Sequence, residues 1–371
     1  MNTEEAKAGD ALARARAMVG EPMYEETGEF PVERGYIWTS CSSVENGNPL
    51  YWDDAVAEAI ADGLIAPPTM LSVWFRPHSW APGREAVRLP LQVHFDLKEI
   101  LGLPEAVISD NTIVFYDPVR IGDVLRTRQI LRSVSEEKTT KLGSGRFWVI
   151  EVESVNQMGE LVGVESYTAF GYVRADSSGT DVQQQAPAEA TGSADEAEPR
   201  GADDVQPERA QSPEGHPPLL AEVSKGDRLP SLSHEVTATT VVLGALASRD
   251  WRPMHHDKDF AVNRNGTKDI FLNTPAQAAW FERYVTDWSG PRGRLGRMSF
   301  RMRGSVFPGD TMVFDSVVSE VGIDDVGCGW VGLAVMLSVG GDVKTSCNVR
   351  VAIPVDAGDN PWKRRSERWQ P

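Results

Sequence analysis

Apolar and polar residues alternate with a period of two in two groups of segments, one in each half of the chain. A strand places successive side chains on opposite faces, so such runs predict antiparallel strands with one buried face. The sequence therefore predicts one antiparallel sheet in each half. The runs are residues 111–116, 124–134, 147–155 and 161–173 in the first half, and 297–304, 311–321, 329–338 and 342–353 in the second.

Helical segments precede the strands in each half. A loop with a short helix is expected at 53–62 and again at 257–262, followed by a more apolar helical stretch at 69–75 and 275–286. A helix laid across a curved antiparallel sheet is an α+β architecture. The expected fold class is therefore α+β, with the same order of elements in both halves.

A polar stretch separates the two groups. From 176 to 215 it contains ten acidic residues and two arginines, so eight of the seventeen net negative charges lie here. A segment with almost no large apolar residue cannot offset its ordering entropy by burial. We expect a first domain at 1–175, a disordered acidic linker at 176–218 and a second domain at 219–371.

The two halves also resemble each other. Residues 48–57 align with 252–261 at a constant offset of 204, and the aligned segments share Pro, Asp and Ala. Further along, 119–123 matches 306–310, each with a Gly-Asp turn signal beside a predicted strand. Two copies of one structural unit are expected.

Composition excludes several classes of protein. Three cysteines without a Cys-x-x-Cys pair predict neither a disulfide framework nor a zinc site, and the net charge of -17 argues against nucleic-acid binding. No apolar run reaches the roughly 18 to 20 residues of a membrane span, and the N-terminus lacks the order of a signal peptide. A cytoplasmic protein without a membrane partner is expected.

The segment 248–261 concentrates the rarest chemistry of the chain. On a continuous helix Asp250 and His255 would point about 140° apart, but Pro253 disfavours helical backbone at Arg252. A bent loop would bring the carboxylate and the imidazole to one water molecule. Such a pair suits general acid–base catalysis, although this spacing of Asp and His also arises by chance.

The surrounding residues extend this pattern to Ser-x-Asp-x-Asn-Pro-x-His-x-Asp-x-x-x-Ala, with Arg252 where Asn is usual. The segment thus resembles the hydratase motif of MaoC-like, R-specific enoyl-CoA hydratases. The resemblance implies a fused double hot-dog fold, in which Asp250 and His255 hold the water and share the proton transfers. Which of them is acid or base stays open. The matching residues are Ser248, Asp250, Pro253, His255, Asp257 and Ala261.

The first half, with Ile-Ala-Pro-Pro-Thr-Met at 65–70, resembles the N-terminal MaoC-type dehydratase domain. Under the offset of 204, Asn46 and Tyr51 replace the aspartate and the histidine. The first half is therefore expected to be non-catalytic and to line the acyl pocket. A purely structural role is the alternative.

Two further sets of residues are candidates for the site. The family commonly has His-Gly-Met where this chain has Leu272-Asn273-Thr274, so the backbone N–H of Asn273 is a candidate oxyanion donor; a helix N-cap is the alternative. Arg297, Arg301 and Arg303 share one strand face. That face either binds the phosphates of coenzyme A or is simply solvated.

The resemblance implies a hydro-lyase that reversibly hydrates a trans-2-enoyl-CoA to an (R)-3-hydroxyacyl-CoA. No metal or other cofactor is implied, and coenzyme A is part of the acyl-CoA thioester substrate. Residues 269–273 and 284–291 resemble a subgroup that acts on bulky, steroid side-chain-like acyl groups. The alternatives are a catalytically silent acyl-CoA-binding subunit or a hot-dog thioesterase. Either a homodimer or a hetero-oligomer with another hot-dog subunit is expected, while acyl length, direction and pathway stay open.

Overall fold

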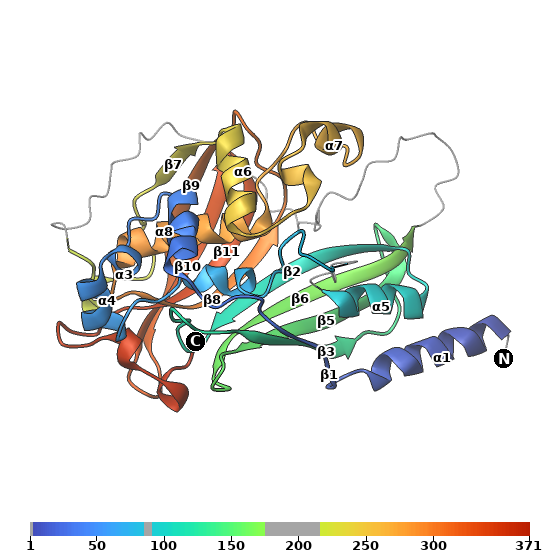
Figure 1. Ribbon diagram of the computed structural model, residues 1–371, viewed down its shortest axis with the longest axis horizontal. Helices are drawn as coiled ribbons and strands as arrows, with labels where there is room; N and C mark the ends of the chain where they lie inside the picture. Colours follow the sequence, from blue (N-terminus) through green and yellow to red (C-terminus); the bar gives the residue numbers. More distant parts are fainter. Residues whose placement is uncertain (1–2, 85–90, 175–215) are drawn as a thin grey trace.

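The strands of both halves join in one continuous antiparallel sheet (Figure 1). The computed structural model describes residues 3–84, 91–174 and 216–371, with side chains from residue 9 onward. Within these residues eleven strands form a sheet in the order β1-β3-β5-β6-β2-β8-β11-β10-β9-β7, with β4 paired to β5. The first half contributes β1 (Pro22–Thr27), β2 (Glu105–Phe115), β3 (Arg126–Val134), β4 (Lys138–Thr140), β5 (Gly143–Val155) and β6 (Leu161–Arg174), and the second half contributes β7 (Leu232–Glu235), β8 (Arg294–Met302), β9 (Thr311–Ile323), β10 (Gly329–Val339) and β11 (Asp342–Ala352).

All eight predicted runs are strands in the structure, with bounds shifted by a few residues. The alternation holds over residues 311–319 of β9 and 329–337 of β10, where every second side chain is buried. The sequence analysis missed β1, β4 and β7. β1 and β7 lie at the two edges of the sheet, and β4 and β7 are too short to show a clear period.

The two halves meet where β2 pairs with β8. Asn111 lies opposite Phe300, and Thr112 lies opposite Ser299. The hydroxyls of Thr112 and Ser299 are 2.9 Å apart and share a hydrogen bond. This junction places residues of β2 and β8 side by side at the centre of the sheet, although they are far apart in the sequence.

In the second half the long helix α8 (Thr274–Ser289) lies across the sheet. Its buried residues include Trp280, Phe281 and Tyr284. The Phe281 ring packs edge-on against Phe300 of β8 and Phe314 of β9. This helix corresponds to the predicted apolar stretch at 275–286 and supplies much of the second half's core.

In the first half the corresponding stretch is not a long helix. The predicted helix at 69–75 is a single 3₁₀ segment, η1 (Pro68–Val73), because Pro77 follows closely and disfavours helical backbone at Arg76. A separate helix, α5 (Gln92–Leu101), packs on the first-half strands β3, β5 and β6 (Figure 1) and was not predicted. Two short elements therefore replace one long helix.

The remaining helices explain the internal repeat. Pro49 begins α3 (Pro49–Trp52) and Pro253 begins η4 (Pro253–His255). Asp53 caps α4 (Asp54–Ala61), just as Asp257 caps α7 (Lys258–Asn263). The shared alanines, Ala57 and Ala261, are both fully buried. The shared Pro, Asp and Ala of the two halves are thus a helix start, an N-cap and a packing contact.

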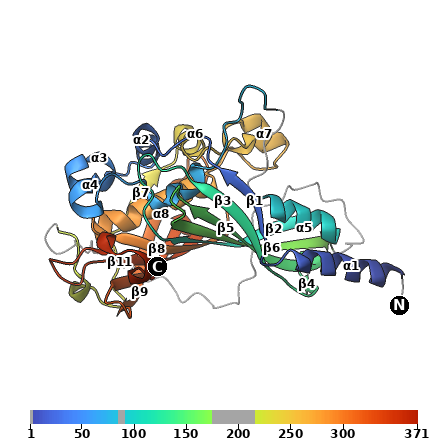
Figure 2. The same cartoon turned by 60° about the horizontal axis from the view of Figure 1, so that its bottom comes forward.

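Two more helices, α2 (Arg34–Ser43) and α6 (Ala238–Ala247), precede these elements and pack side by side (Figure 2). None of the helices in the described ranges is long and apolar enough to cross a membrane. The predicted linker lies almost entirely outside the described residues. Shorter or terminal helices are α1 (Thr3–Ala17), η3 (Leu220–Glu222), η5 (Pro361–Lys363) and η6 (Ser366–Arg368).

Buried polar contacts hold the halves together. The carboxylate of Glu282 on α8 accepts hydrogen bonds from Tyr51 Oη at 2.8 Å and from Thr69 N and Oγ1 at 3.0 and 2.6 Å. A second contact between the halves is made by the buried Arg294 of β8. It donates to the Tyr116 carbonyl at 2.6 Å and stacks over the Trp369 ring. These contacts fix the first half against α8 and β8.

Candidate active site

The bend predicted around Pro253 is present. The helix α6 ends at Ala247, Arg249 adopts a positive φ of 53°, and Arg252 is extended with ψ of 127°. The Asp250 N–H still reaches back to the Ala245 carbonyl at 2.9 Å. As a result His255 Nε2 lies 3.6 Å from Asp250 Oδ2. The structure therefore brings the predicted pair together.

Close packing of α6 on the start of α8 positions this loop. A Cβ on Gly244 would lie only 2.7 Å from the Cβ of Ala276, so glycine allows the two helices to approach. Ser248, at the end of α6, donates from Oγ to the Gly244 carbonyl at 2.7 Å and accepts from Asn273 Nδ2 at 2.7 Å. Ser248 thus links the loop that carries Asp250 (residues 248–252, the aspartate loop) to the N-terminus of α8.

The orientation of His255 leaves its Nε2 atom facing the carboxylate. Nδ1 lies 2.8 Å from the Phe271 carbonyl, which can only accept, so Nδ1 carries the proton. The Nε2 atom is buried and has no hydrogen-bond partner within the described residues. Burial lowers the pKa of His255, despite the opposing effect of Asp250. A neutral imidazole with a free lone pair at Nε2 follows.

Asp250 is held as a carboxylate. Arg252 donates from Nε and Nη2 to its two oxygens, each at 2.9 Å, and Asn273 Nδ2 donates at 3.0 Å. Burial alone would raise the pKa of Asp250, but the hydrogen bonds and the charge of Arg252 outweigh burial and hold the pKa well below its usual range. Arg252, the one departure from the motif, is therefore a direct partner of the aspartate.

Asn273 is the N-cap of α8, as one of its two predicted roles requires. Its Oδ1 accepts from Ala276 N at 3.1 Å, while its Nδ2 reaches Ser248 and Asp250. Pro275 has no N–H, and the N–H groups of Asn273 and Thr274 find no acceptor within the described residues. These two N–H groups at the helix start are the candidates for the oxyanion role.

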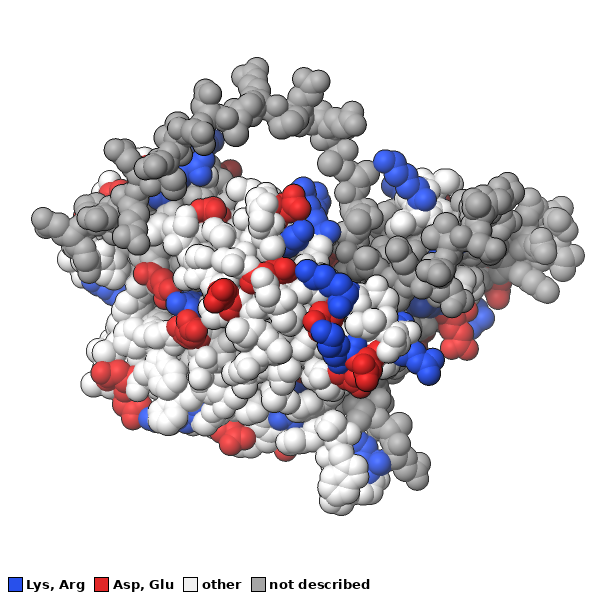
Figure 3. Space-filling model, turned by 90° about the horizontal axis from the view of Figure 1, so that it is seen from above, with Lys and Arg blue, Asp and Glu red and all other residues white. Residues whose placement is uncertain are grey.

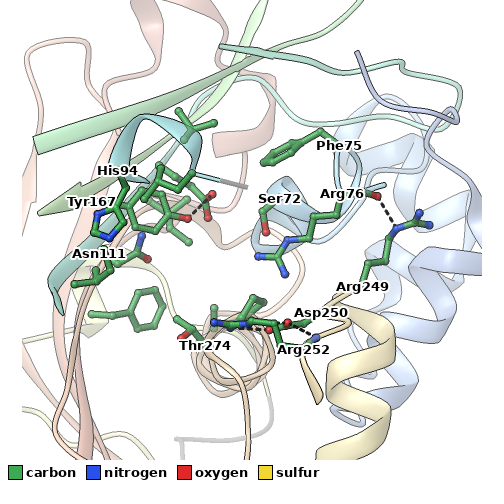
Figure 4. A pocket seen from close by; sticks show the side chains of 18 of the residues that line it. Ser72, Phe75, Arg76, His94, Asn111, Tyr167, Arg249, Asp250, Arg252 and Thr274 are labelled. Atoms are coloured by element: carbon green, nitrogen blue, oxygen red, sulfur yellow. Dashed lines mark hydrogen bonds and ion pairs between the residues drawn. The ribbon is translucent and has the colours of Figure 1, made fainter. Parts of the chain in front are cut away.

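A cavity of about 660 Å³ opens beside this loop (Figure 4). Asp250 and Arg252 line it, whereas His255 is 2% exposed and lies behind the carboxylate. Most of the wall comes from the first half, including residues of η1, α5, β2 and β6. The lining residues from the first half include Thr69, Ser72, Phe75, Arg76, Leu91, His94, Phe95, Asn111, Ile113, Val152, Glu165 and Tyr167, and those from the second half include Arg249, Trp251, Thr274, Ala278, Phe300 and Met302.

The first half also holds the aspartate loop in place. Arg249 Nε donates to the Arg76 carbonyl at 2.9 Å, and Arg76 Nη1 donates to the Ser248 carbonyl at 3.2 Å. Trp251 Nε1 donates to the Pro77 carbonyl at 2.9 Å. Sequence analysis missed Arg76 and Arg249 because no motif marks them. Their pairing depends on two loops that meet only in the folded chain.

The other predicted residues lie outside the cavity. Tyr51 is buried against Glu282, and Asn46 accepts from the Asn48 N–H at 3.0 Å, so their positions hold no acid–base pair. Arg297 and Arg301 are exposed on the face of β8 opposite Met298 and Phe300, and Arg303, directly after β8, is also exposed. Phe300 and Met302 line the cavity, so these three arginines point away from it.

Figure 3 shows the molecule from the side of α6 and α7. Lys and Arg side chains stand next to Asp and Glu side chains on this face, rather than together in one large basic patch. Arg76, Arg249 and Arg252 are the arginines that line the cavity within the described residues. Cationic groups for an anionic ligand are thus concentrated at the aspartate end of the cavity.

Comparison with solved structures identifies the fold. A MaoC-like dehydratase of known structure aligns with a TM-score of 0.63 and 19% identity over 92% of this chain and 99% of that one. A conserved Mycobacterium tuberculosis protein with a double hotdog fold aligns with a TM-score of 0.56 and 14% identity over 90% and 96% of the two chains. The expected double hot-dog fold is confirmed.

Sequence comparison then shows the family. The family model described as FAS1-like, dehydratase domain region, matches residues 17–164. The 3-oxo-4,17-pregnadiene-20-carboxyl-CoA hydratase beta subunit of Mycobacterium tuberculosis is 38% identical over 96 residues, which are 26% of this chain and 74% of that protein. This chain belongs to the MaoC-like hydratase and dehydratase family, with two hot-dog units in one polypeptide.

Proposed function

We propose that the protein reversibly hydrates a trans-2-enoyl-CoA to an (R)-3-hydroxyacyl-CoA at Asp250 and His255. The observation that carries the proposal is the 3.6 Å approach of His255 Nε2 to Asp250 Oδ2 beside a cavity of about 660 Å³. Membership of the hydratase family supports the reaction class. The low pKa of Asp250 beside Arg252 and the lowered pKa of the buried His255 support an ionised carboxylate and a neutral imidazole in this proposal.

These states assign the proton transfers. A carboxylate held by Arg252 is a weak base, so Asp250 orients the water by accepting one of its hydrogen bonds. The free lone pair of His255 Nε2 takes the water proton as the water oxygen bonds to C3 of the enoyl group. The π electrons of the C2–C3 double bond move towards C2 and the thioester oxygen, and the imidazolium then returns the proton to C2, which leaves a C2–C3 single bond. One water molecule is added and His255 regains its neutral form.

The thioester oxygen gains negative charge while the C3–O bond forms. In our proposal the backbone N–H groups of Asn273 and Thr274, at the positive end of α8, donate to this oxygen. The guanidinium of Arg252 lies on the same cavity wall and adds positive charge. Asn273 would thus act through its backbone on the substrate and through its side chain on Asp250.

The size of the cavity favours a bulky acyl group. A volume of about 660 Å³ corresponds to about twenty water molecules at roughly 30 Å³ each. A four-carbon acyl chain would leave most of this space unfilled, whereas a drug-sized ligand suits such a volume. One relative is named as the hydratase of a pregnadiene carboxyl-CoA, which supports a polycyclic, steroid side-chain-like substrate.

The coenzyme A portion and the partner subunits extend the proposal. The cavity arginines, Arg76, Arg249 and Arg252, suit the phosphate groups better than Arg297, Arg301 and Arg303, which point away. Relatives named as alpha and beta hydratase subunits support assembly with another hot-dog subunit, and a homodimer is the alternative. No metal or other cofactor enters the proposed chemistry.

One observation favours a second candidate, a silent acyl-CoA-binding subunit. The Arg252 side chain binds both carboxylate oxygens of Asp250, and His255 does not line the cavity. Hydration requires Arg252 to leave room for water beside the pair. A binding subunit would instead keep the ion pair closed and leave chemistry to its partner.

The test is an assay with a panel of trans-2-enoyl-CoA thioesters of increasing bulk. Loss of the conjugated-thioester absorbance with formation of the (R)-3-hydroxy product supports the hydratase. Release of free coenzyme A instead would identify a thioesterase. Tight binding of the saturated thioester without either reaction would favour the silent subunit. The Asp250→Asn variant, assayed beside the wild type, controls for contaminating hydratase.

A further inference from the structure

A second group of polar side chains lies in the cavity, away from Asp250. Tyr167 on β6, Asn111 on β2 and Phe300 on β8 stand opposite one another in the sheet, so they form one row across the cavity floor. Figure 4 shows His94, Tyr167 and Asn111 together on one side of the cavity, with Asp250 and Arg252 on the other. The cavity therefore has two polar ends joined by apolar walls.

Asn111 is the notable member of this group. It is 8% exposed, it lines the cavity, and its Nδ2 has no hydrogen-bond partner within the described residues. A buried side-chain amide without a partner is costly, and each such group in a folded protein requires an explanation. On a central strand that joins the two halves, a Leu or Ile would pack without this cost. A ligand atom that accepts from the amide would account for it.

The neighbours of Asn111 in the cavity carry phenol, imidazole and carboxyl groups, and the adjacent Asp110 also lines the cavity. Tyr167 donates its hydroxyl proton to Glu165 Oε2 at 3.0 Å, which leaves the phenol oxygen free to accept. Burial raises the pKa of both Tyr167 and Glu165. His94 accepts from Trp148 Nε1 at 3.3 Å, and burial lowers its pKa to about 4, so it is neutral at pH 7. The unpartnered amide donor of Asn111 and the acceptor oxygen of Tyr167 together suit a neutral, oxygen-bearing group.

We propose that this cluster, which we call the distal polar site (His94, Asn111, Glu165 and Tyr167), binds a neutral oxygen substituent on the far part of the acyl group. The Asn111 amide donates to that oxygen. A hydroxyl substituent would in addition donate to Tyr167 Oη, whereas a ketone would use Asn111 alone. The inference rests on the proposed function for the thioester end of the ligand. It adds that the preferred acyl group is oxygenated as well as bulky.

The experiment compares two series of trans-2-enoyl-CoA thioesters of medium and long chain length. One series ends in a methyl group and the other carries a terminal hydroxyl, so that chain length varies the distance from the thioester. At the length that reaches the distal polar site, the hydroxylated substrate should have a kcat/KM about tenfold higher, the effect of one buried neutral hydrogen bond. A third series with a terminal ketone distinguishes the two oxygen types.

Variants assign the preference to residues. Asn111→Leu should bring the ratio of the two kcat/KM values close to one. Thr112→Val, at the next residue of β2 on the opposite face, should keep the wild-type ratio. Tyr167→Phe should reduce the preference for the hydroxyl but not for the ketone. A wild type without preference at any length, or an Asn111→Leu variant that keeps it, would overturn the inference.

Binding separates this inference from the proposed function. Calorimetric titration with saturated acyl-CoA and terminally hydroxylated acyl-CoA needs no turnover. If no thioester is hydrated and the hydroxylated ligand still binds about tenfold more tightly, the hydratase proposal fails and the distal polar site stands. If enoyl-CoA is hydrated and neither kcat/KM nor Kd favours the oxygenated ligand, the hydratase stands and the distal polar site fails.

Discussion

Arg252 Nε and Nη2 each donate a 2.9 Å hydrogen bond to a different carboxylate oxygen of Asp250. Two parallel N–H···O bonds from a guanidinium give both charge and orientation to a carboxylate. The residue that departs from the family motif is therefore the one that holds the aspartate ionised. A carboxylate held in this way is a weak base, so the proposed chemistry uses His255 as the general base.

The first prediction concerns Asp250 and His255 as one unit. Asp250→Asn and His255→Ala should each lower kcat by about 10²- to 10⁴-fold, because each removes a partner of the same water. The double variant should be scarcely slower than the slower single variant. Steady-state kinetics on one enoyl-CoA, with circular dichroism as the folding control, measures this. Near-normal hydration by either single variant would show that the site lies elsewhere.

The second prediction concerns pH. Burial lowers the pKa of His255 below its ordinary value of about 6.5, and Arg252 lowers it further, so wild-type activity should persist below pH 6.5. Arg252→Asn, which restores the usual motif residue, removes a positive charge from both groups. The pKa values of His255 and Asp250 should rise, and the acidic limb of the kcat/KM profile should move to higher pH.

The matched variant for this experiment is Arg292→Asn. Arg292 lies near the C-terminal segment, where it donates to the carbonyls of Ala357 and Asp359, and it does not line the cavity. Its removal should leave the acidic limb in place. A limb that stays fixed or moves to lower pH in Arg252→Asn would contradict the assignment of His255 as the base.

The third prediction concerns the buried contact between the halves. Tyr51→Phe removes one of three hydrogen bonds to the fully buried Glu282 and should reduce the free energy of unfolding by about 1–3 kcal/mol. Hydration should remain close to normal, because Tyr51 does not line the cavity. Urea denaturation measures the stability. Tyr172→Phe, at another buried tyrosine, is the control and should change stability less.

The pH dependence of this contact has a definite sign. Burial raises the pKa of Glu282 above its ordinary value, although Thr69 and Tyr51 oppose the shift. Folding is therefore favoured most when the carboxyl is protonated, and this contribution is lost as pH rises through the folded pKa. Glu282→Gln should remove that dependence. An unchanged slope of stability against pH between the ordinary and the raised pKa would contradict it.

The fourth prediction concerns the bulk of the acyl group. Ala278 on α8 is buried and lines the cavity, so Ala278→Phe should fill part of the space. The KM for a polycyclic enoyl-CoA should rise about tenfold relative to that for crotonyl-CoA, which corresponds to about 1.4 kcal/mol. Ala279→Phe places the same ring on the next face of α8 as a control. Equal changes for both substrates would show that the acyl group lies outside this cavity.

Much of the fold could be predicted because its signals are local. Alternation along a strand reports which face is buried, and Asp257 and Pro253 act within one turn of their own position. The bend between Asp250 and His255 has a local signal in Pro253, although long-range contacts such as that of Arg249 with the Arg76 carbonyl hold the loop in place. The same holds for the internal repeat at an offset of 204 residues. Its shared Pro, Asp and Ala have the same structural roles in both halves.

The chain thus determines by itself the two β-rich units, the paired helix starts and the bend at Pro253, because each depends on neighbours within a few residues. Tertiary structure alone decides that β2 pairs with β8, that residues of both halves line one cavity, and that Asn111, Tyr167 and Phe300 share one row. Strand register and the packing of one half on the other depend on contacts far apart in sequence, which no local period reports. For the same reason Arg76 and Arg249 could be placed at the aspartate loop only once the two halves were seen together.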